Sequence, residues 1–496
     1  MSHFLGIDVS TTATKALLLD GDGVVVSEGI SSYSFDSPRP TWAEQDPHVW
    51  WDAAGEAIRS AVADAGIETT AIDAVGLTGQ MHGSVLLDVS GEVVRPAILW
   101  NDQRTAAECD QIREMVGREH LIATTGNDAL TGFTAPKLLW VANHEPENWE
   151  RVATIMLPKD YVRFGLTGER AVDAADGSGT ILFDLGQRTW STDILTELDL
   201  DPAICPPVYE GPQVTGTVSA AAAGVTGLRT GTPVVAGGGD QSANAVGVGA
   251  VEPGVFALSL GTSGVVFATS DGVAIEPEGR LHSFCHAVPG KWHMMGVMLS
   301  AAGSLRWLRD ALAPHLSYEE LMTGAAQVPP GSEGLWFLPY LSGERTPHPD
   351  PLARGAFIGL TSSHDLAHLT RAVLEGVAFG LRDGLDLMID SGLAPPDSVR
   401  GSGGGLRSRL WTQVLADVLG VAISKVSTDE GAAYGAAILA AVGAGNFESV
   451  EAATKSLVSV TETMEPSGDV DFYVQAHAGY QDLYPALRPT FHRTGS

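Results

Sequence analysis

Two segments that lie half a chain apart show the same order of apolar and turn-forming positions. Residues 4–23 contain an apolar stretch, a turn of Ser and Thr at 10–12, and a second apolar stretch that ends in an acidic-glycine turn. Residues 256–272 repeat this order around a Gly-Thr-Ser-Gly turn at 261–264. Each segment predicts two strands joined by a tight turn. We therefore expect a duplicated domain, with two unrelated hairpins as the alternative.

Amphipathic helices and apolar strands alternate between these segments and beyond them. Asp46 is followed by Pro47, a pair typical of an N-cap and a first helical position, and apolar residues then recur at helical spacing. Further helices are predicted at 366–388 and 411–419, and strands at 72–77 and 233–236. Strands that alternate with helices predict an α/β fold in which ligands bind at the carboxyl ends of the strands.

The chain is predicted to divide into two domains near residue 250. A Glu-Pro-Gly sequence at 252–254 precedes the second hairpin and marks the boundary. We expect an N-terminal domain at 1–250, a C-terminal domain at 251–485 and a tail at 486–496. The sequence has no low-complexity linker, so the two domains are expected to face each other closely across a cleft.

The composition narrows the classes of partner. The 496 residues hold 29 Lys and Arg against 60 Asp and Glu, a formal net charge of −31. This acidity argues against a nucleic acid or an anionic membrane surface as partner, because both bind clustered basic residues. The three cysteines form no CxxC motif, and the amino-terminal residues lack the basic segment of a signal peptide. We expect a protein of the reducing cytoplasm without a membrane span.

Glycine is unusually frequent, with 58 residues in the chain where an average protein has roughly 7%. Because the sequence has no Gly-X-Y repeat, we expect the excess in turns and where the backbone approaches a ligand closely. The glycines expected at a ligand are Gly237, Gly238, Gly239, Gly261, Gly264, Gly403, Gly404 and Gly405.

The two hairpin turns are candidates for binding an anion through backbone N–H groups and hydroxyls. Thr11 and Thr12 lie in the first turn, with Lys15 as a charged neighbour, and Gly261 and Thr262 lie in the second. Either turn alone is as typical of folding as of binding, but a pair on duplicated domains indicates a clamp on one polyphosphate. The GxxxxGK[ST] pattern does not occur in the sequence, which excludes a P-loop.

A third glycine-rich turn, at 403–405, precedes the predicted helix at 411–419. Consecutive glycines at this position let a ligand contact the backbone at the N-terminus of the helix. A flexible turn is the alternative. The turn does not match the GxGxxG pattern after a first strand, so a Rossmann fold is not favoured.

Two aspartates lie where a carboxylate could take part in chemistry. Asp240 follows three glycines at the start of a predicted helix at 241–248, where the helix dipole favours its ionised form. It is suited to accept a sugar hydroxyl proton during phosphoryl transfer, with an ordinary N-cap as the alternative. Asp8 ends the first predicted strand and is a candidate for holding Mg²⁺ through water, with a solvated turn carboxylate as the alternative.

Polar residues mixed with large apolar ones follow two further strands, at 80–83 and at 100–104. Such mixtures suit a polyol, which needs hydrogen bonds at its hydroxyls and an aromatic wall at its carbon face. For His82 in the first group, a structural histidine with all its hydrogen bonds made is the alternative. The charged loop Glu344–His348 has a composition that indicates no particular chemistry.

Together these motifs resemble the FGGY carbohydrate kinases of the sugar kinase, heat-shock protein 70 and actin superfamily, and among them most closely the bacterial xylulokinases. Residues 132–140 are similar to the first family signature and residues 355–375 to the second. The segments that look specifically xylulokinase-like are 79–83, 100–104, 237–240 and 338–347. The resemblance covers residue 4 to about residue 485.

The resemblance implies two actin-like, ribonuclease H-like domains around an interdomain cleft. It implies ATP-dependent phosphorylation of D-xylulose to D-xylulose 5-phosphate in pentose catabolism, with Asp240 as general base and second metal ligand, and Asp8 placing Mg²⁺ through water. The residues expected at the sugar are Met81, His82, Trp100, Asn101, Asp102 and Gln241. Those expected at ATP are Thr11, Thr12, Lys15, Gly261, Thr262, Gly403, Gly404, Gly405 and Ser408. A homodimer is expected by analogy with relatives.

Two positions depart from the family pattern, and three other functions stay open. Ser10 stands where many members carry Gly, and Gln241 stands where some relatives carry Asn, which leaves the preferred stereochemistry of the sugar open. The alternatives are a kinase for another ketose or a pentitol, an actin-like or chaperone-like ATPase without a sugar substrate, and a non-catalytic sugar sensor. The segments at 81–82 and 237–240 argue against the ATPase, and the presence of Asp240 argues against the sensor.

Overall fold

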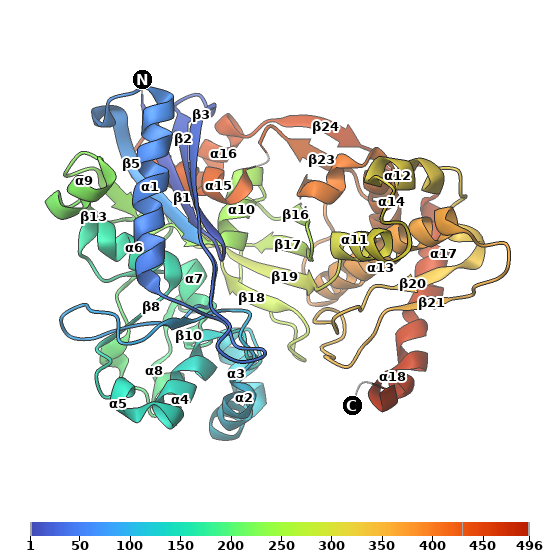
Figure 1. The fold of residues 1–496 in the computed structure, drawn as a ribbon, viewed down its shortest axis with the longest axis horizontal. Coiled ribbons are helices and arrows are strands. Elements are labelled where there is room, and N and C mark those ends of the chain that lie inside the picture. The colour runs from blue at the N-terminus through green and yellow to red at the C-terminus, as the bar shows by residue number, and fades with distance from the viewer. Residues whose placement is uncertain (1, 429, 495–496) are drawn as a thin grey trace.

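The computed structural model describes residues 2–428 and 430–494, and this part of the chain contains two seven-stranded mixed sheets (Figure 1). The first sheet has the order β13 (Val214–Thr217), β14 (Pro233–Val235), β5 (Ile72–Gly79), β1 (His3–Val9), β2 (Ala13–Asp20) and β3 (Val25–Ser32), with β15 (Gly238–Gly239) also beside β5. The second has the order β24 (Val460–Met464), β23 (Ile423–Val426), β22 (Ser398–Ser402), β16 (Val255–Leu260), β17 (Gly264–Ser270), β19 (Trp292–Met298) and β18 (His282–Cys285).

The two sheets repeat one pattern of strand pairing, which confirms the predicted duplication. β1 is antiparallel to β2 and parallel to β5, just as β16 is antiparallel to β17 and parallel to β22. The next strands outward agree as well, because β14 is parallel to β5 as β23 is to β22, and β3 is antiparallel to β2 as β19 is to β17. The two hairpin turns therefore occupy equivalent places in the two halves.

The predicted helices are present, with small shifts at their ends. α1 (Pro47–Ala65) begins after Asp46, whose carboxylate accepts a hydrogen bond from the backbone N–H of His48. α13 (Leu366–Asp390) and α14 (Arg409–Leu419) cover the two helices predicted in the second half. The other α-helices of the described chain are α2 (Ala106–Ile112), α3 (Arg118–Thr125), α4 (Thr134–His144), α5 (Pro146–Trp149), α6 (Pro158–Thr167), α7 (Ala174–Ser178), α8 (Thr192–Glu197), α9 (Ala220–Thr226), α10 (Asp240–Val248), α11 (Ala302–Leu312), α12 (Tyr318–Ala325), α15 (Gly431–Gly443), α16 (Val450–Leu457), α17 (Val470–Gln481) and α18 (Leu483–Thr494).

Helix α15 belongs to the second half of the sequence but packs on the first sheet. Figure 1 shows it in red beside β1, and it contacts β1, β5 and α10. The approach is close because glycines lie at the crossing points. A Cβ atom on Gly6 would overlap the backbone oxygen of Ala433, and one on Gly435 would overlap that of Ala243. Residues beyond the predicted boundary near 250 therefore complete the core of the N-terminal half.

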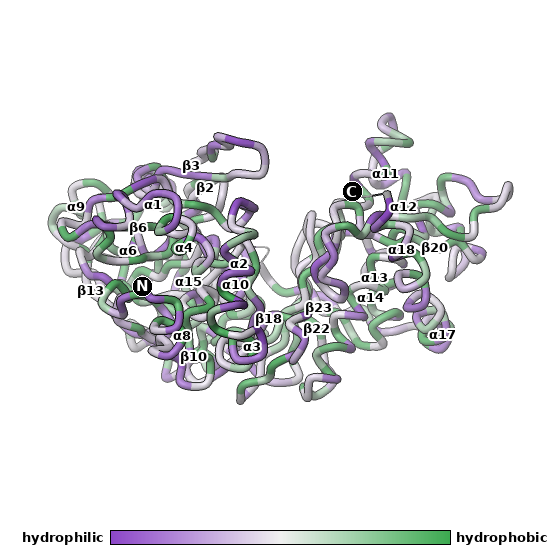
Figure 2. The backbone as a smooth tube through the Cα atoms, turned by 90° about the horizontal axis from the view of Figure 1, so that it is seen from below, coloured by the Kyte–Doolittle hydropathy of each residue, from purple (hydrophilic) through white to green (hydrophobic). Residues whose placement is uncertain are grey.

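The far end of the second sheet contacts the N-terminal half through buried polar groups. The amide of Asn127 donates to the backbone oxygen of Ser283 at 2.8 Å, and its side-chain oxygen lies 2.9 Å from His282 Nδ1. The Trp292 indole donates to the backbone oxygen of Leu185 at 2.7 Å. Figure 2 shows that the molecule narrows between its two bodies, with β18 in the narrow part. These contacts fix how the strand ends of one half face the other.

The segment set apart as a tail at 486–496 forms most of α18 as far as residue 494. Phe491 is 6% exposed, and His492 Nε2 lies 2.8 Å from Asp350 Oδ2, so this end of the chain packs on the C-terminal half. Among the described residues, no helix combines the length and the apolar character that crossing a membrane requires.

Candidate active site

The carboxyl ends of three strands of the first sheet bring two carboxylates together. Asp8 near the end of β1 and Gly238 of β15 both pair in register with Thr78 of β5, from opposite sides. Asp240 follows β15 directly as the first residue of α10. The two carboxylates are close enough for the charge of Asp240 to raise the pKa of Asp8. The strand ends thus assemble both aspartates that the sequence indicated at one edge of the sheet.

Asp8 has an acceptor atom that the protein leaves without a partner. Its Oδ1 is buried and accepts no hydrogen bond from the described residues. Burial, reinforced by Asp240, raises the pKa of Asp8 to about 7, because the charged form loses solvation and faces a like charge. No group of three or more His, Cys, Asp and Glu residues suited to a metal occurs in the described chain. The donor set therefore fits Mg²⁺ that takes most of its ligands from phosphate and water.

Asp240 has the electrostatics of a base that works near neutral pH. Gly239, and not Asp240, is the N-cap of α10, so the alternative role as an ordinary N-cap is wrong. Burial raises the pKa of Asp240 to about 6, and hydrogen bonds from Gln241 limit this rise. A carboxylate with this pKa is mostly ionised at pH 7 yet takes up a proton readily, as a general base must. Gln241 therefore lies against the carboxylate itself.

The glycines before Asp240 provide close packing within the protein. A Cβ atom on Gly237 would overlap the backbone oxygen of Leu77, and one on Gly239 would lie 2.7 Å from Met81 Cγ. Gly237 also has a φ of 83°, which a residue with a side chain rarely adopts. Packing within the protein is therefore enough to require glycine here, and a contact between this backbone and a ligand stays a prediction. They let the chain lie against β5 and Met81, which brings Asp240 to the strand edge.

The first hairpin turn contacts the residues expected at the sugar. The Thr11 hydroxyl accepts a hydrogen bond from the Trp100 indole at 3.0 Å and donates to Gln80 Oε1 at 3.2 Å. Thr12 is exposed at the tip of the turn. Thr11 is thus held at the side of the predicted sugar site, while the hydroxyl of Thr12 is open to a ligand.

Lys15, expected at ATP as a charged neighbour of the first turn, lies on β2. It is opposite Asp8 in the β1–β2 register. Its ammonium forms ion pairs with Glu430, at the start of α15, and with Glu28 at 3.6 Å. Both carboxylates raise the pKa of Lys15. In this conformation the ammonium of Lys15 stabilises the contact between the two halves of the chain. A phosphate group would have to compete with two carboxylates to bind this ammonium.

His82 is held in a left-handed backbone conformation at the end of β5, with a φ of 69°. Two side chains of α4, within the first family signature, donate to its carbonyl oxygen: Lys137 Nζ at 2.8 Å and the Thr134 hydroxyl at 3.1 Å. Burial lowers the pKa of His82 to about 3, so its ring is neutral at pH 7. Because Nδ1 lies 2.8 Å from the Gly179 carbonyl and must donate there, Nε2 is an acceptor.

In the loop at 100–102, two side chains are available to a ligand and the third forms hydrogen bonds within the protein. The Trp100 side chain is exposed beside Thr11, and the Asn101 side-chain oxygen is buried without a partner in the described chain. Asp102 is fully buried and accepts hydrogen bonds from the backbone of Ala43 and from the guanidinium of Arg104. Both of its oxygens are used within the protein, so its direct contact with a sugar stays a prediction.

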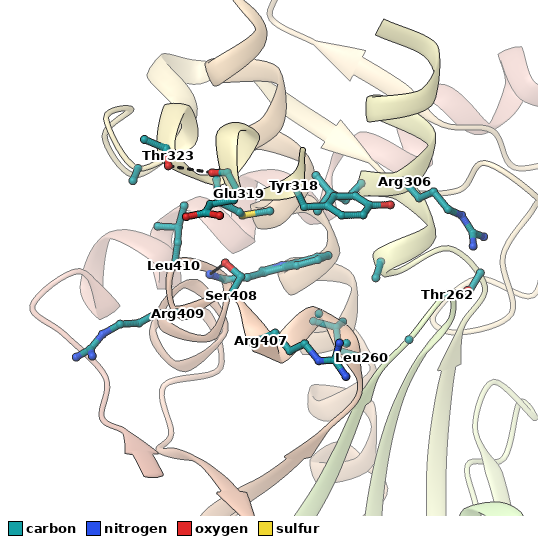
Figure 3. A pocket seen from close by; sticks show the side chains of 18 residues that line it. Leu260, Thr262, Arg306, Tyr318, Glu319, Thr323, Arg407, Ser408, Arg409 and Leu410 are labelled. Atoms are coloured by element: carbon teal, nitrogen blue, oxygen red, sulfur yellow. Dashed lines mark hydrogen bonds between the residues drawn. The ribbon is translucent and has the colours of Figure 1, made fainter. Parts of the chain in front are cut away.

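The second hairpin turn and the third glycine-rich turn meet in one pocket of about 780 Å³ in the C-terminal half (Figure 3). The predicted nucleotide-binding residues that line it are Gly261, Thr262, Gly404, Gly405 and Ser408. The Ser408 hydroxyl caps α14. Gly261 and Gly404 leave open space where a side chain would point, whereas Gly264, Gly403 and Gly405 face other parts of the protein. Of these five glycines, Gly261, Gly404 and Gly405 line the pocket, and a side chain would have room only at Gly261 and Gly404.

Other walls of this pocket come from residues that sequence reasoning missed. Figure 3 shows Tyr318 of α12 beside Arg306 of α11, above Ser408 and Arg407. Met322 adds a further apolar wall from α12. An apolar slot with basic groups at its rim suits a flat ring that carries an anionic chain. The spacing of apolar residues along 318–325 is equally typical of a helix that packs on the protein core, so the sequence gave no indication of a binding site.

Comparison with known protein families identifies both halves of the chain. A model described as the N-terminal domain of the FGGY family of carbohydrate kinases matches residues 3–247, and the C-terminal domain of the same family matches residues 256–444. The chain belongs to the FGGY family of carbohydrate kinases. The resemblance inferred from the motifs is confirmed, and so is the two-domain fold class.

Proteins named xylulose kinase resemble this FGGY kinase over nearly its whole length. One from Escherichia coli strain K12 is 46% identical over 89% of this chain and 90% of its own. The crystal structure of a xyloylose kinase from Brucella ovis superposes with a TM-score of 0.93 at 39% identity, covering 98% of this chain and 100% of that one. A xylulose kinase structure from Rhodospirillum rubrum has a TM-score of 0.92 at 35% identity, with 99% and 100% covered.

Proposed function

We propose that this kinase transfers the γ-phosphoryl group of ATP to D-xylulose, forming D-xylulose 5-phosphate and ADP. The observation that carries the proposal is the position of Asp240, a carboxylate with a pKa near neutrality, at the strand edge that also holds Asp8 and His82. The similarity to proteins named xylulose kinase over 89% of the chain supports the choice of sugar.

The transfer is a displacement in which Asp240 manages the proton. The terminal hydroxyl oxygen of the sugar bonds to the γ-phosphorus, and the bond from phosphorus to the oxygen that bridges to the β-phosphate breaks. The electrons of the broken bond leave with ADP, and the hydroxyl proton moves to Asp240. Magnesium carried by ATP, held at Asp8 through water, would offset the negative charge of the phosphates.

The two ligands have separate binding surfaces in this assignment. The pocket at Gly404 and Tyr318 receives the adenosine part of ATP, and the hairpin turns at 10–12 and 261–263 receive its phosphates through backbone and hydroxyl donors. Trp100 covers the carbon face of the sugar, while the unpartnered Asn101 oxygen is available to a hydroxyl. Closure of the two halves over both ligands would exclude water and so limit hydrolysis of ATP.

Replacing His82 by Ala is expected to weaken sugar binding selectively. The substitution removes the Nε2 acceptor, and a lost hydrogen bond corresponds to a rise of about tenfold in the KM for D-xylulose. The KM for ATP should stay within about twofold, since His82 is remote from the pocket at Gly404. Initial rates with each substrate varied in turn measure both constants. His144→Ala, at an exposed histidine of α4, is the matched control, and equal rises in both KM values would contradict the placement of His82.

The choice of sugar is tested with an ADP-release assay on the wild-type enzyme across D-xylulose, D-ribulose, xylitol and D-arabitol. We expect kcat/KM to be highest for D-xylulose by about tenfold or more, because a site that hydrogen-bonds each hydroxyl discriminates strongly against wrong stereochemistry. A higher value for another ketose or a pentitol would overturn the choice of sugar. ADP release that no sugar stimulates would favour an actin-like ATPase.

A further inference from the structure

The loop between β20 (Trp336–Leu338) and β21 (Ala356–Ile358) carries a guanidinium that the mechanism above does not use. Arg345 lies in this loop, and the residues on both sides of it are tied to the end of β19. Thr346 exchanges hydrogen bonds with Val297, through its backbone N–H at 3.1 Å and its hydroxyl at 3.2 Å. The Glu344 carboxylate accepts a hydrogen bond from the Leu299 N–H at 2.9 Å. The backbone at Arg345 is therefore fixed beside the carboxyl end of β19 in the second sheet.

Within residues 2–428 and 430–494, no carboxylate forms an ion pair with Arg345. Its guanidinium forms no hydrogen bond or ion pair with any residue in the described ranges. The ionised form of its neighbour Glu344 acts on this charge, but burial raises the pKa of that carboxyl to about 8, so it is mainly protonated at pH 7. Arginine stays charged in proteins, and Arg345 is half-buried, so its guanidinium has water but no protein group of the described chain to offset its charge. The guanidinium of Arg345 is therefore available to bind an anion.

The surroundings of Arg345 indicate which anion this is. On one side, the segment that begins at Leu299 continues into Ala301 and Ala302, whose backbone N–H groups donate to the oxygens of Thr262 and Gly261 in the second hairpin turn, both at 2.9 Å. On the other side, the positive charge of Arg345 acts on His82 and lowers the pKa of that ring. The loop of Arg345 is thus linked through residues 299–302 to the turn assigned to the phosphates, and its charge acts on His82, which is assigned to the sugar.

We propose that Arg345 binds the phosphoryl group as it passes from ATP to the sugar, and that it then holds the phosphate of the sugar phosphate product. A guanidinium matches phosphate oxygens with two parallel N–H donors, and it is the planar group that proteins use for this purpose. A neutral sugar would leave the charge of Arg345 uncompensated. Arg345 also supplies positive charge from the C-terminal half that Lys15, paired with two carboxylates, does not. The assignment rests on the proposed function.

Arg345→Gln is expected to lower kcat by about 10²–10³, the usual effect of removing one donor to a developing negative charge. The KM for D-xylulose should change by no more than about twofold, because the interaction forms with the phosphoryl group and not with the sugar. Arg345→Lys, which keeps the charge but loses the planar fork, should recover part of the rate. Arg354→Gln is the matched control, since Arg354 is in the same loop and donates only to the backbone oxygens of Pro351 and Ala353.

Calorimetric titration separates this inference from the proposed function, because it needs no turnover. Arg345→Gln should bind D-xylulose 5-phosphate at least about tenfold more weakly than wild type while its affinity for D-xylulose stays unchanged. Wild-type kcat and product affinity in Arg345→Gln would overturn the inference. A raised KM for D-xylulose with unchanged kcat would do so as well, since it would assign Arg345 to the sugar. Failure of the wild-type enzyme to phosphorylate D-xylulose would count against the proposed function alone.

Discussion

Replacement of Asp240 by Asn is expected to lower kcat by about 10²–10⁴ while the affinity for the sugar stays near its wild-type value. Asn keeps the size of the side chain at the start of α10 but cannot take up the hydroxyl proton. Steady-state rates give kcat, and calorimetric titration with D-xylulose gives the affinity. Asp193→Asn is the matched control, because Asp193 is an exposed aspartate in the first turn of α8. Wild-type turnover by a correctly folded Asp240→Asn variant would contradict the assignment.

Because the pKa of Asp240 is raised, its role as general base also predicts how the rate depends on pH. With a pKa of about 6, the carboxylate is ionised at pH 7 and mostly protonated at pH 5. At saturating ATP, kcat/KM for the sugar should therefore fall about tenfold for each pH unit below 6. The residual activity of Asp240→Asn should lack this acidic limb. A limb that persists in the variant would assign the ionisation to another group.

Replacement of Asp8 by Asn is expected to have opposite effects on activity and on stability. The variant loses the carboxylate that fits Mg²⁺, so kcat/KM for ATP should fall by about 10²–10³ at subsaturating Mg²⁺. Added Mg²⁺ should restore this loss only in part. The wild-type carboxylate is also a source of instability, because its pKa of about 7 shows that the folded state disfavours its charged form. Removal of that charge should raise the melting temperature at alkaline pH.

The pH dependence of this stabilisation follows from the sign of the shift. The folded protein holds the Asp8 proton up to pH 7, while the unfolded chain loses it near the ordinary value of 3.8. The destabilising effect of Asp8 therefore begins above about pH 4 and is complete above pH 7. We expect Asp8→Asn to raise Tm at pH 8 by about 1 °C per kcal/mol recovered in a chain of 496 residues, and by less at pH 5. Asp52→Asn, at an exposed position of α1, is the control. A lower Tm at pH 8 in Asp8→Asn would contradict this account.

The duplicated fold could be predicted because its signal is local. Apolar stretches on either side of short Ser, Thr and Gly turns define the hairpins β1–β2 and β16–β17, and their likeness requires no knowledge of contacts. The position of α15 could not be predicted in this way. Its residues are apolar on all sides, which indicates burial but not the sheet against which the helix is buried. Its contact with β1 depends on small residues at both surfaces, such as Gly6.

In the candidate site as well, some features could be predicted from the sequence and others depend on contacts in three dimensions. Asp8 and Asp240 were predictable because strand ends meet at one edge of a sheet, and the structure places them there. The role of the glycines before Asp240 could not be predicted, because a glycine that packs against the protein and one that contacts a ligand look alike in sequence. Arg345 was visible as a charged residue in a loop. Its importance lies in the absence of a partner within the described chain, which only the three-dimensional arrangement reveals.

We infer that the two halves of this chain act together to move a phosphoryl group from ATP to D-xylulose. A ³¹P NMR spectrum of wild-type enzyme with ATP, Mg²⁺ and D-xylulose tests it most directly, because it identifies the acceptor of the group. We expect ADP and a sugar phosphate monoester in equal amounts, with little inorganic phosphate. A spectrum in which ADP appears together with inorganic phosphate and without a sugar monoester would contradict it.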